Sequence, residues 1–229
     1  MSFNESQAEL DSFGGQQRVL GAKSGSSVYA LFGKRAIDIV VSVALIVALA
    51  PVMLSITLIL MIMEGTPFFA HERIGRGRRS FKCLKFRTMS QNSARDLRFT
   101  LRTDVYAAQE WRDAQKLTVD PRITWIGRFL RSTSLDELPQ LINVLRGQMS
   151  MVGPRPVTEA ELKFYGADLA LYLSVRPGLT GHWQVHGRGT TIFEDRVAMD
   201  RSYVRSINFL TDIKLMIQTG GVVLKRTGS

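Results

Sequence analysis

Two adjacent carboxylates, Asp136 and Glu137, lie in the segment 131–156, RSTSLDELPQLINVLRGQMSMVGPRP. Pro139 fits only the first turn of an unbroken helix, so we expect a helix to begin near Asp136, with both carboxylates at its positive end. That end of a helix also attracts phosphate and metal ions. Guanidinium groups, which suit phosphate oxygens, are available from three arginines nearby: Arg128, Arg131 and Arg155. The pattern therefore indicates phosphoryl transfer.

The same residues have a purely structural explanation. Ser134 and Glu137 have the spacing of a capping box, in which both side chains satisfy free amides at a helix start. Capping boxes are commoner than active sites, so the two acids alone do not establish catalysis. The surrounding arginines favour the catalytic interpretation.

An apolar run precedes this segment. Residues 39–63 contain no charged side chain in twenty-five positions, and Pro51 stands at their centre. Twelve helical residues on each side of a proline kink reach only about 18 Å, against roughly 30 Å of hydrocarbon. Basic residues lie on both sides of the run, which favours placing both ends on the cytoplasmic face. We therefore predict a re-entrant helix-break-helix over residues 33–64.

The alternative is a single tilted span with a proline kink, because twenty-five apolar residues are long enough to cross a bilayer. The charge symmetry favours the hairpin, as does the position of all the recognisable chemistry after the run. A secretory signal is not expected, because the run is too long and begins more than thirty residues into the chain. The residues assigned to the membrane segment are Lys34, Arg35, Asp38 and Pro51, and we expect Lys34 and Arg35 to hold lipid phosphate.

Composition limits the other function classes. The chain has 229 residues and a formal net charge of +10, and ten Lys or Arg stand against two acids between His71 and Thr103. Such a stretch attracts anions, which could be lipid headgroups, a nucleotide diphosphate or nucleic acid. Cys83 is the single cysteine, so no intrachain disulfide can form. Three scattered histidines do not indicate a zinc site, and any metal is expected to be a hard cation held by carboxylate.

The expected fold class is α+β and mainly helical. We predict a mobile tail at 1–32, the membrane hairpin at 33–64, and a small cytosolic catalytic domain at 65–229 that lies against the membrane. A short β-hairpin is expected around Gly75-Arg76-Gly77. Helices are expected in part of 90–118 and over 123–130, 138–145 and 193–226. Trp111 could anchor at the interface, and the last helix carries an apolar stripe of Leu210, Ile213, Met216, Ile217 and Leu224.

Three motifs give the chain a resemblance to a known family. They are KFRTM at 85–89, SLDELPQLINVLRGQMSMVGPRP at 134–156 and RPGLTGHWQVHGRG at 176–189. Together they resemble the bacterial sugar transferases known as monotopic phosphoglycosyl transferases, over about Gly33 to Lys225. Ala50 and Thr66 depart from the pattern, since many relatives have serine before the central proline and a glycine-proline context before Pro67.

The resemblance implies an activity and a location. Such enzymes transfer a sugar phosphate from a UDP-sugar to undecaprenyl phosphate and release UMP, which begins exopolysaccharide or O-antigen assembly. They act from a re-entrant helix in the bacterial inner membrane, with the catalytic domain on the cytoplasmic face. The compact form resembles the galactose- and glucose-1-phosphate transferases. A homo-oligomer is compatible with this reading, and nucleic acid is not an expected partner, because no recognition module is present.

The resemblance also implies residue roles. Asp136 is the expected nucleophile, forming an acyl phosphate, and Glu137 is its partner. Mg²⁺, bound with help from Asp136, is expected to neutralise the diphosphate. Further contacts to the phosphates or the nucleotide are expected from Lys85, Arg87, Arg128, Arg131, Arg155, Arg176, Gly178, Thr180, Gly181 and Gln184. For the glycine-rich loop, a turn required only for backbone geometry is the open alternative. The histidines at 182 and 186 are expected to pack in a loop.

A different class of function would use the same basic stretch. A membrane-anchored adaptor could bind anionic lipid or nucleic acid through residues 71–102 without any catalysis. Its function should survive replacement of Asp136, whereas a covalent enzyme should lose turnover while staying folded.

Overall fold

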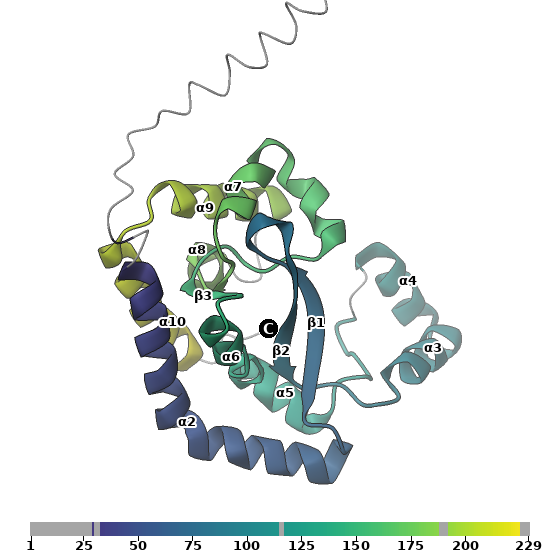
Figure 1. Ribbon diagram of the computed structural model, residues 1–229. Coiled ribbons are helices and arrows are strands. Elements are labelled where there is room, and N and C mark those ends of the chain that lie inside the picture. The colour runs from purple at the N-terminus through teal and green to yellow at the C-terminus, as the bar shows by residue number, and fades with distance from the viewer. Residues whose placement is uncertain (1–28, 30–32, 115–116, 188–191, 225–229) are drawn as a thin grey trace, which may run out of the picture.

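The computed structural model describes residues 29, 33–114, 117–187 and 192–224, so most of the tail predicted for 1–32 lies outside the described residues. The chain is α+β and mainly helical, as predicted (Figure 1). The helices are α2 (Lys34–Glu64), α3 (Ser93–Thr103), α4 (Val105–Ala114), α5 (Trp125–Ser132), α6 (Gln140–Leu145), α7 (Leu169–Ser174), α8 (His182–His186), α9 (Phe193–Arg205) and α10 (Phe209–Leu224). Short 3₁₀ turns are η2 (Arg76–Arg78), η3 (Leu135–Glu137) and η4 (Glu159–Asp168), and the strands are β1 (Phe68–Ile74), β2 (Ser80–Phe86), β3 (Ser150–Val152) and β4 (Gly178–Thr180).

Helix α2 is continuous but sharply bent, with Pro51 inside it near the middle (Figure 1). The expected kink is confirmed, but the helix does not break into two separate segments. Proline provides no amide to the preceding turn, which allows the bend. Beyond it, the Ser55 hydroxyl donates to the Pro51 carbonyl (2.9 Å) and the Thr57 hydroxyl donates to the Met53 carbonyl (2.7 Å). Such bonds to the i−4 carbonyl favour helix bending, so these hydroxyls support the bend.

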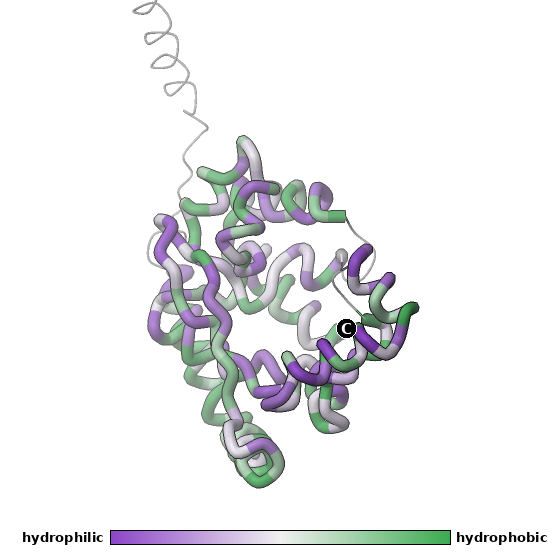
Figure 2. Tube along the Cα trace, turned by 90° about the vertical axis from the view of Figure 1, so that its right-hand side faces the viewer, coloured by the Kyte–Doolittle hydropathy of each residue, from purple (hydrophilic) through white to green (hydrophobic). Residues whose placement is uncertain are grey.

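Much of the apolar surface of α2 is exposed. Val40 and Val47 in the first arm are 67% and 69% exposed, and Leu54 and Ile62 in the second arm are 61% and 85% exposed. The second arm, seen nearly end-on at the bottom of Figure 2, protrudes below the rest of the chain. By length and composition, α2 is the one helix among the described residues that could cross a membrane. An apolar surface of this extent is typical of contact with lipid or a partner.

The first arm of α2 is fastened to the domain by polar side chains. Arg35 donates to the carbonyls of Val144 (2.7 Å) and Leu145 (2.9 Å), at the C-terminal end of α6. Asp38 is buried, and it accepts from the Ser150 hydroxyl (2.9 Å) and the Met151 amide (2.8 Å). Arg35 was expected to hold lipid phosphate, but here its guanidinium binds the two carbonyls of the protein. These contacts anchor the helix within the protein.

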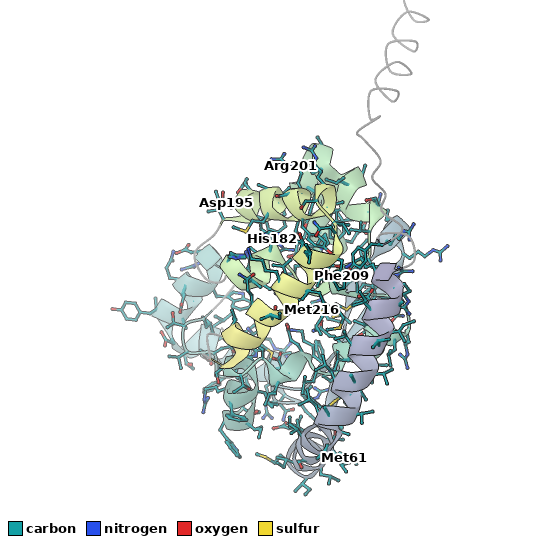
Figure 3. All side chains as sticks on the ribbon, turned by 90° about the vertical axis from the view of Figure 1, so that its left-hand side faces the viewer. Met61, His182, Asp195, Arg201, Phe209 and Met216 are labelled. Carbon is teal, nitrogen blue, oxygen red and sulfur yellow. The ribbon has the colours of Figure 1, made fainter. Side chains whose placement is uncertain are left out.

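Lys34 is likewise engaged by the protein rather than held free for lipid phosphate. Its Nζ donates to Asp212 (2.6 Å) and to the Tyr203 hydroxyl (2.9 Å), while the Tyr203 hydroxyl also donates to Asp212 (2.8 Å). The Asp212 carboxylate further accepts from Tyr29 (2.6 Å). The side chains of Lys34 and Asp212 are only 14% and 2% exposed. In Figure 3, α10 runs from Phe209 past Met216 beside α2, and this ion pair joins the two helices.

Replacing Asp212 by Ala should destabilise the fold by about 3 to 5 kcal/mol, because it leaves a largely buried ammonium without its partner. Thermal unfolding in neutral detergent would measure the change. Asp195→Ala on α9 is the control, since Asp195 is exposed and its loss should cost less than about 0.5 kcal/mol. Equal melting temperatures for the two variants would contradict the anchoring role of Asp212.

The predicted β-hairpin is confirmed. Strands β1 and β2 pair antiparallel from Phe68 opposite Phe86 to Ile74 opposite Ser80. The turn contains two left-handed positions, Gly77 (φ 66°) and Arg78 (φ 60°). Because side chains alternate along a strand, His71 and Cys83 form a pair on the same face as Lys85. That face carries the candidate site.

The remaining elements surround this hairpin. Helices α3 and α4 confirm the helix expected in 90–118, and they form an arm beside the body of the molecule (Figure 1). Trp111 lies against Arg122, whose guanidinium carbon is 4.9 Å from the ring centroid. Helix α5 confirms the helix expected at 123–130, and its Leu130 packs with Ile56 and Leu60 from the second arm of α2. The two arms of α2 therefore dock on different sides of the domain.

The helical pattern expected over 193–226 is confirmed, and it forms two helices, α9 and α10. The apolar stripe has two environments, because Leu210 and Ile217 are 76% and 71% exposed, whereas Met216 packs against the core. Leu215, which is 2% exposed, is the main core residue of α10. A parallel pair, β3 and β4, also forms beside α10, and the sequence did not indicate it.

Candidate active site

Asp136 and Glu137 lie in the 3₁₀ turn η3, which precedes α6. The prediction that they open the helix itself was wrong, since Pro139 is the residue before the first turn of α6. Ser134 adopts a left-handed conformation (φ 57°), and its side chain makes no capping hydrogen bond. The capping-box explanation therefore does not apply. A separate strained turn presents the two carboxylates.

Lys85 on β2 is the cation closest to both acids. Its Nζ lies 2.7 Å from Glu137 Oε1 and 3.6 Å from Asp136 Oδ2. Asn143 of α6 fixes this strand against the turn, since its Oδ1 accepts from the Leu84 amide (2.9 Å) and its Nδ2 donates to the Lys82 carbonyl (2.8 Å). Asn143 is fully buried. It is a positioning residue that the sequence reasoning missed, although a polar side chain within QLINVL was a signal.

Burial dominates the electrostatics of the pair. It raises the pKa of Asp136 above its ordinary value, and the neighbouring Glu137 raises it further, while the charges of Lys85 and Arg131 lower it. For Lys85, burial acts to lower the pKa, but the two carboxylates outweigh it and hold the pKa above its ordinary value. Asp136 is 8% exposed. The site thus holds a poorly solvated carboxylate beside a firmly protonated lysine.

A cavity of about 510 Å³ opens onto these groups. Four of the expected phosphate contacts line it together with both acids: Lys85, Arg87, Arg131 and Arg155. The Nε of Arg131 donates to Thr88 Oγ1 (2.9 Å), which fixes the direction of this guanidinium. The face of the hairpin supplies further lining residues, Phe69, His71, Arg73 and Cys83. Their alternation along β1 and β2 was the signal that could have identified them.

Trp183 lines the same cavity and was also missed. The guanidinium carbon of Arg155 lies 5.0 Å from the centroid of its ring, and that of Arg196 lies 5.5 Å away. Burial lowers the pKa of Arg155, because the charged form loses solvation. Trp183 follows His182 within RPGLTGHWQVHGRG, so the motif indicated its neighbourhood but not its orientation. The histidine rings at 182 and 186 lie 5.8 Å apart and do not line this cavity. Both were expected to pack in a loop, but they lie on helix α8, and His186 is exposed.

The glycine-rich loop has mainly a packing role. A Cβ on Gly178 would come within 2.1 Å of the Gly153 nitrogen, and one on Gly181 within 2.3 Å of the Gly153 oxygen. These glycines permit the close approach of β3 and β4, which is the backbone alternative stated above. The Thr180 hydroxyl lies 2.5 Å from that of Thr219 and does not line the large cavity. Gln184 instead borders a small cavity of about 30 Å³, which Gly178, Lys85 and Glu137 also line.

Two predicted phosphate contacts lie away from the acids. Arg128 is exposed, and its Nη1 donates to the Ile123 carbonyl (3.2 Å). Arg176 donates through Nε to the Gly147 carbonyl (2.8 Å) and lines a different cavity. Arg128 was expected there because it lies just upstream of the acids, and Arg176 because its loop resembles the family motif. Neither lines the large cavity, because α5 and the loop before β4 direct these side chains elsewhere.

The residues fit a magnesium ion only if substrate shares its coordination. Among the described residues, no group of three or more His, Cys, Asp or Glu could hold a metal. Mg²⁺ commonly binds one or two carboxylates together with substrate phosphates and water. Asp136, a buried oxygen donor facing the cavity, meets that requirement.

Comparison with known proteins places this geometry in a family. A family model described as "Bacterial sugar transferase" matches residues 29–226. The chain is 50% identical over 198 residues to a UDP-galactose-lipid carrier transferase of Erwinia amylovora, covering 86% of this chain and 42% of that protein. It is 44% identical to an undecaprenyl-phosphate galactose phosphotransferase of Salmonella typhimurium, with the same coverage. It is 43% identical to the exopolysaccharide production protein ExoY of Sinorhizobium fredii, covering 86% of this chain and 87% of that protein.

The chain therefore spans about two fifths of the length of the first two of these relatives. The family match covers nearly all the described residues, including the bent helix, the β-hairpin and the turn that carries the two acids. The chain belongs to the bacterial sugar transferase family.

Proposed function

We propose that this protein transfers a hexose-1-phosphate from a UDP-sugar to undecaprenyl phosphate and releases UMP, as an initiating step in exopolysaccharide assembly. The observation that carries the proposal is the buried Asp136 beside Lys85, at a cavity lined by three arginines that the sequence predicted. The names of the relatives support the same lipid and sugar classes. Galactose is the first donor to test and glucose the second.

In the first step, a carboxylate oxygen of Asp136 attacks the phosphorus that bears the sugar. The bond from that phosphorus to the bridging oxygen breaks, and UMP leaves with the electron pair. Arg131 and Arg155, which line the cavity, stabilise charge on the phosphoryl oxygens. Lys85 lowers the pKa of Asp136 against the effect of burial, which favours the carboxylate, and it pairs with Glu137. The product of this step is an aspartyl phosphosugar.

In the second step, a phosphate oxygen of undecaprenyl phosphate attacks the same phosphorus, and Asp136 leaves as a carboxylate. Glu137 holds Lys85 in place and stands next to the nucleophile, where it assists the incoming phosphate. When bound, Mg²⁺ supplies positive charge that neutralises the diphosphate. Asp136, with Glu137 adjacent, would hold it.

Helix α2 brings the lipid substrate to the site. Its bend at Pro51 and its exposed apolar surface support a re-entrant insertion with both ends on one side of the inner membrane. The first arm contacts α6 and β3, and the second arm packs near Phe86, at the end of β2. In this arrangement the cavity faces the cytoplasm at the level of the lipid headgroups.

Release of UMP from nanodisc-held protein tests the proposal. The assay uses Mg²⁺, undecaprenyl phosphate and a panel of UDP-sugars that includes galactose, glucose and their N-acetyl forms. We expect release with one or two hexose donors and dependence on the lipid phosphate for repeated turnover. A folded protein that releases no UMP with any donor would contradict the transferase and favour the adaptor.

A further inference from the structure

A second cavity, of about 580 Å³, lies at the turn end of the β-hairpin and shares no lining residue with the catalytic cavity. Its walls come from η2 and the start of β2, from the loop after α6, and from the residue before Pro177. Four arginines line it: Arg76, Arg79, Arg146 and Arg176. The proposed transfer reaction uses none of them.

The cavity is lined by hydrogen-bond donors and carries no compensating acid. No Asp or Glu is among the described residues that line it, and none of the four arginines forms an ion pair with another described residue. Gln148 already accepts from Asn143 through its Oε1 (2.7 Å), which leaves its NH₂ group as a donor. Ser80 adds a hydroxyl. A concave, donor-rich wall of this kind suits an anion with several oxygens.

The turn of the β-hairpin places Arg78 outside the cavity that the four arginines line. Arg78, between Arg76 and Arg79, has a left-handed conformation (φ 60°), and its guanidinium pairs with Glu159 across a different cavity. Its two neighbours remain on the wall of the arginine-lined cavity. The three arginines of this turn, Arg76, Arg78 and Arg79, therefore have different surroundings, and only Arg78 pairs with a carboxylate of the described residues.

Arg176 is less exposed than the other three arginines of this cavity. Its Nε donates to the Gly147 carbonyl, so its terminal nitrogens remain for a ligand. Burial lowers its pKa, and the charges of Arg35 and Arg76 lower it further. A bound anion would relieve this accumulation of positive charge.

We propose that this cavity is a second binding site, for the phosphate group of an anionic ligand, separate from the catalytic cavity. Gly147, on its wall, lies beside Arg35: a Cβ built on Gly147 would be 3.5 Å from Arg35 Nη2. The cavity therefore adjoins the start of α2, where the chain meets the membrane in the proposed arrangement. That position makes a phospholipid headgroup the first source to test, and soluble phosphate the second.

The test measures ligand-dependent thermal stabilisation of the full chain in neutral detergent. Dioctanoyl phosphatidic acid, dioctanoyl phosphatidylcholine and inorganic phosphate are titrated separately, because a ligand that binds only the folded state raises the melting temperature. The site variant is Arg76→Gln with Arg146→Gln. The matched control is Arg78→Gln with Arg102→Gln, which removes the same charge from exposed positions outside this cavity.

We expect the apparent Kd for phosphatidic acid to rise about tenfold or more in the site variant, and to stay within about twofold of wild type in the control. Stabilisation by phosphatidic acid but not by inorganic phosphate identifies a lipid headgroup. Equal, site-dependent stabilisation by both identifies a soluble phosphate source. If the site variant is unstable, Arg79→Gln alone replaces it. Equal affinities for the site and control variants would overturn the proposal, as would stabilisation by none of the probes.

Discussion

Asp136→Asn is expected to lower the rate of UMP release by at least about 10⁴-fold, because the amide cannot form the acyl phosphate. The residue lies on the cavity wall beside Lys85, and in the proposed scheme no other described group replaces it as nucleophile. Incubation with a UDP-sugar labelled in the phosphate next to the sugar, without lipid acceptor, should leave radioactivity on wild-type protein and none on the variant. Labelling of both proteins would show that Asp136 is not the nucleophile.

The same variant should be folded and more stable than wild type near pH 8. Because the folded-state pKa of Asp136 is raised, its ionisation destabilises the fold as the pH rises through that pKa. Asparagine removes this penalty, so its melting temperature should exceed that of wild type at high pH and converge with it at low pH. Asp195→Asn serves as a control at an exposed position. The melting curves show whether the variant is folded. A loss of turnover in a folded variant can then be assigned to catalysis rather than to unfolding.

Lys85→Gln is the second change with a large expected effect, a fall in turnover of about 10²-fold or more. The ammonium lowers the pKa of Asp136 against the effect of burial. Without it, more of the carboxylate is protonated at neutral pH, and the acidic limb of the pH–rate profile should move to higher pH.

The control for this prediction is Lys82→Gln, three residues earlier on β2, where the side chain is exposed and does not line the cavity. Its turnover and its pH profile should match those of wild type. A Lys85→Gln enzyme with reduced turnover and an unshifted acidic limb would show that Lys85 binds substrate without tuning Asp136. Full activity in that variant would contradict both roles.

The sequence predicted the parts of the fold that depend on short-range patterns. Alternation and the Gly75-Arg76-Gly77 turn identified the β-hairpin, and the apolar run with Pro51 identified the bent helix. It did not indicate the β3–β4 pair, because pairing of two three-residue strands depends on contacts between residues that are distant in the chain. The close approach of the backbone at Gly153 and Gly178 can be recognised only when the positions of both strands are known.

The candidate site shows the same difference between what short-range patterns predict and what depends on contacts between distant residues. The structure brings Asp136, Glu137 and Arg155 together at one cavity, as the sequence led us to expect, although Arg155 is nineteen residues from Asp136. Arg128 was assigned because it lies just upstream of the acids, and Arg176 because its loop resembles the family motif. Both lie elsewhere, since the direction of a side chain depends on the element that carries it. The surroundings of Lys34 were also misjudged, because its partner Asp212 is 178 residues away.

The two docked arms of α2 connect the proposed membrane segment to the candidate site. Arg35 and Asp38 fix the first arm to the ends of α6 and β3. Leu60 fixes the second arm to the hydrophobic cluster that contains Phe86. The bend therefore gives one helix two separate attachments to the domain, one at the end of α6 and at β3 and one at Phe86, which lines the catalytic cavity. In the re-entrant arrangement proposed above, a thinner or thicker bilayer would act on both attachments through the exposed apolar surface of α2. Acyl-chain length is then expected to be a variable of the proposed transfer reaction.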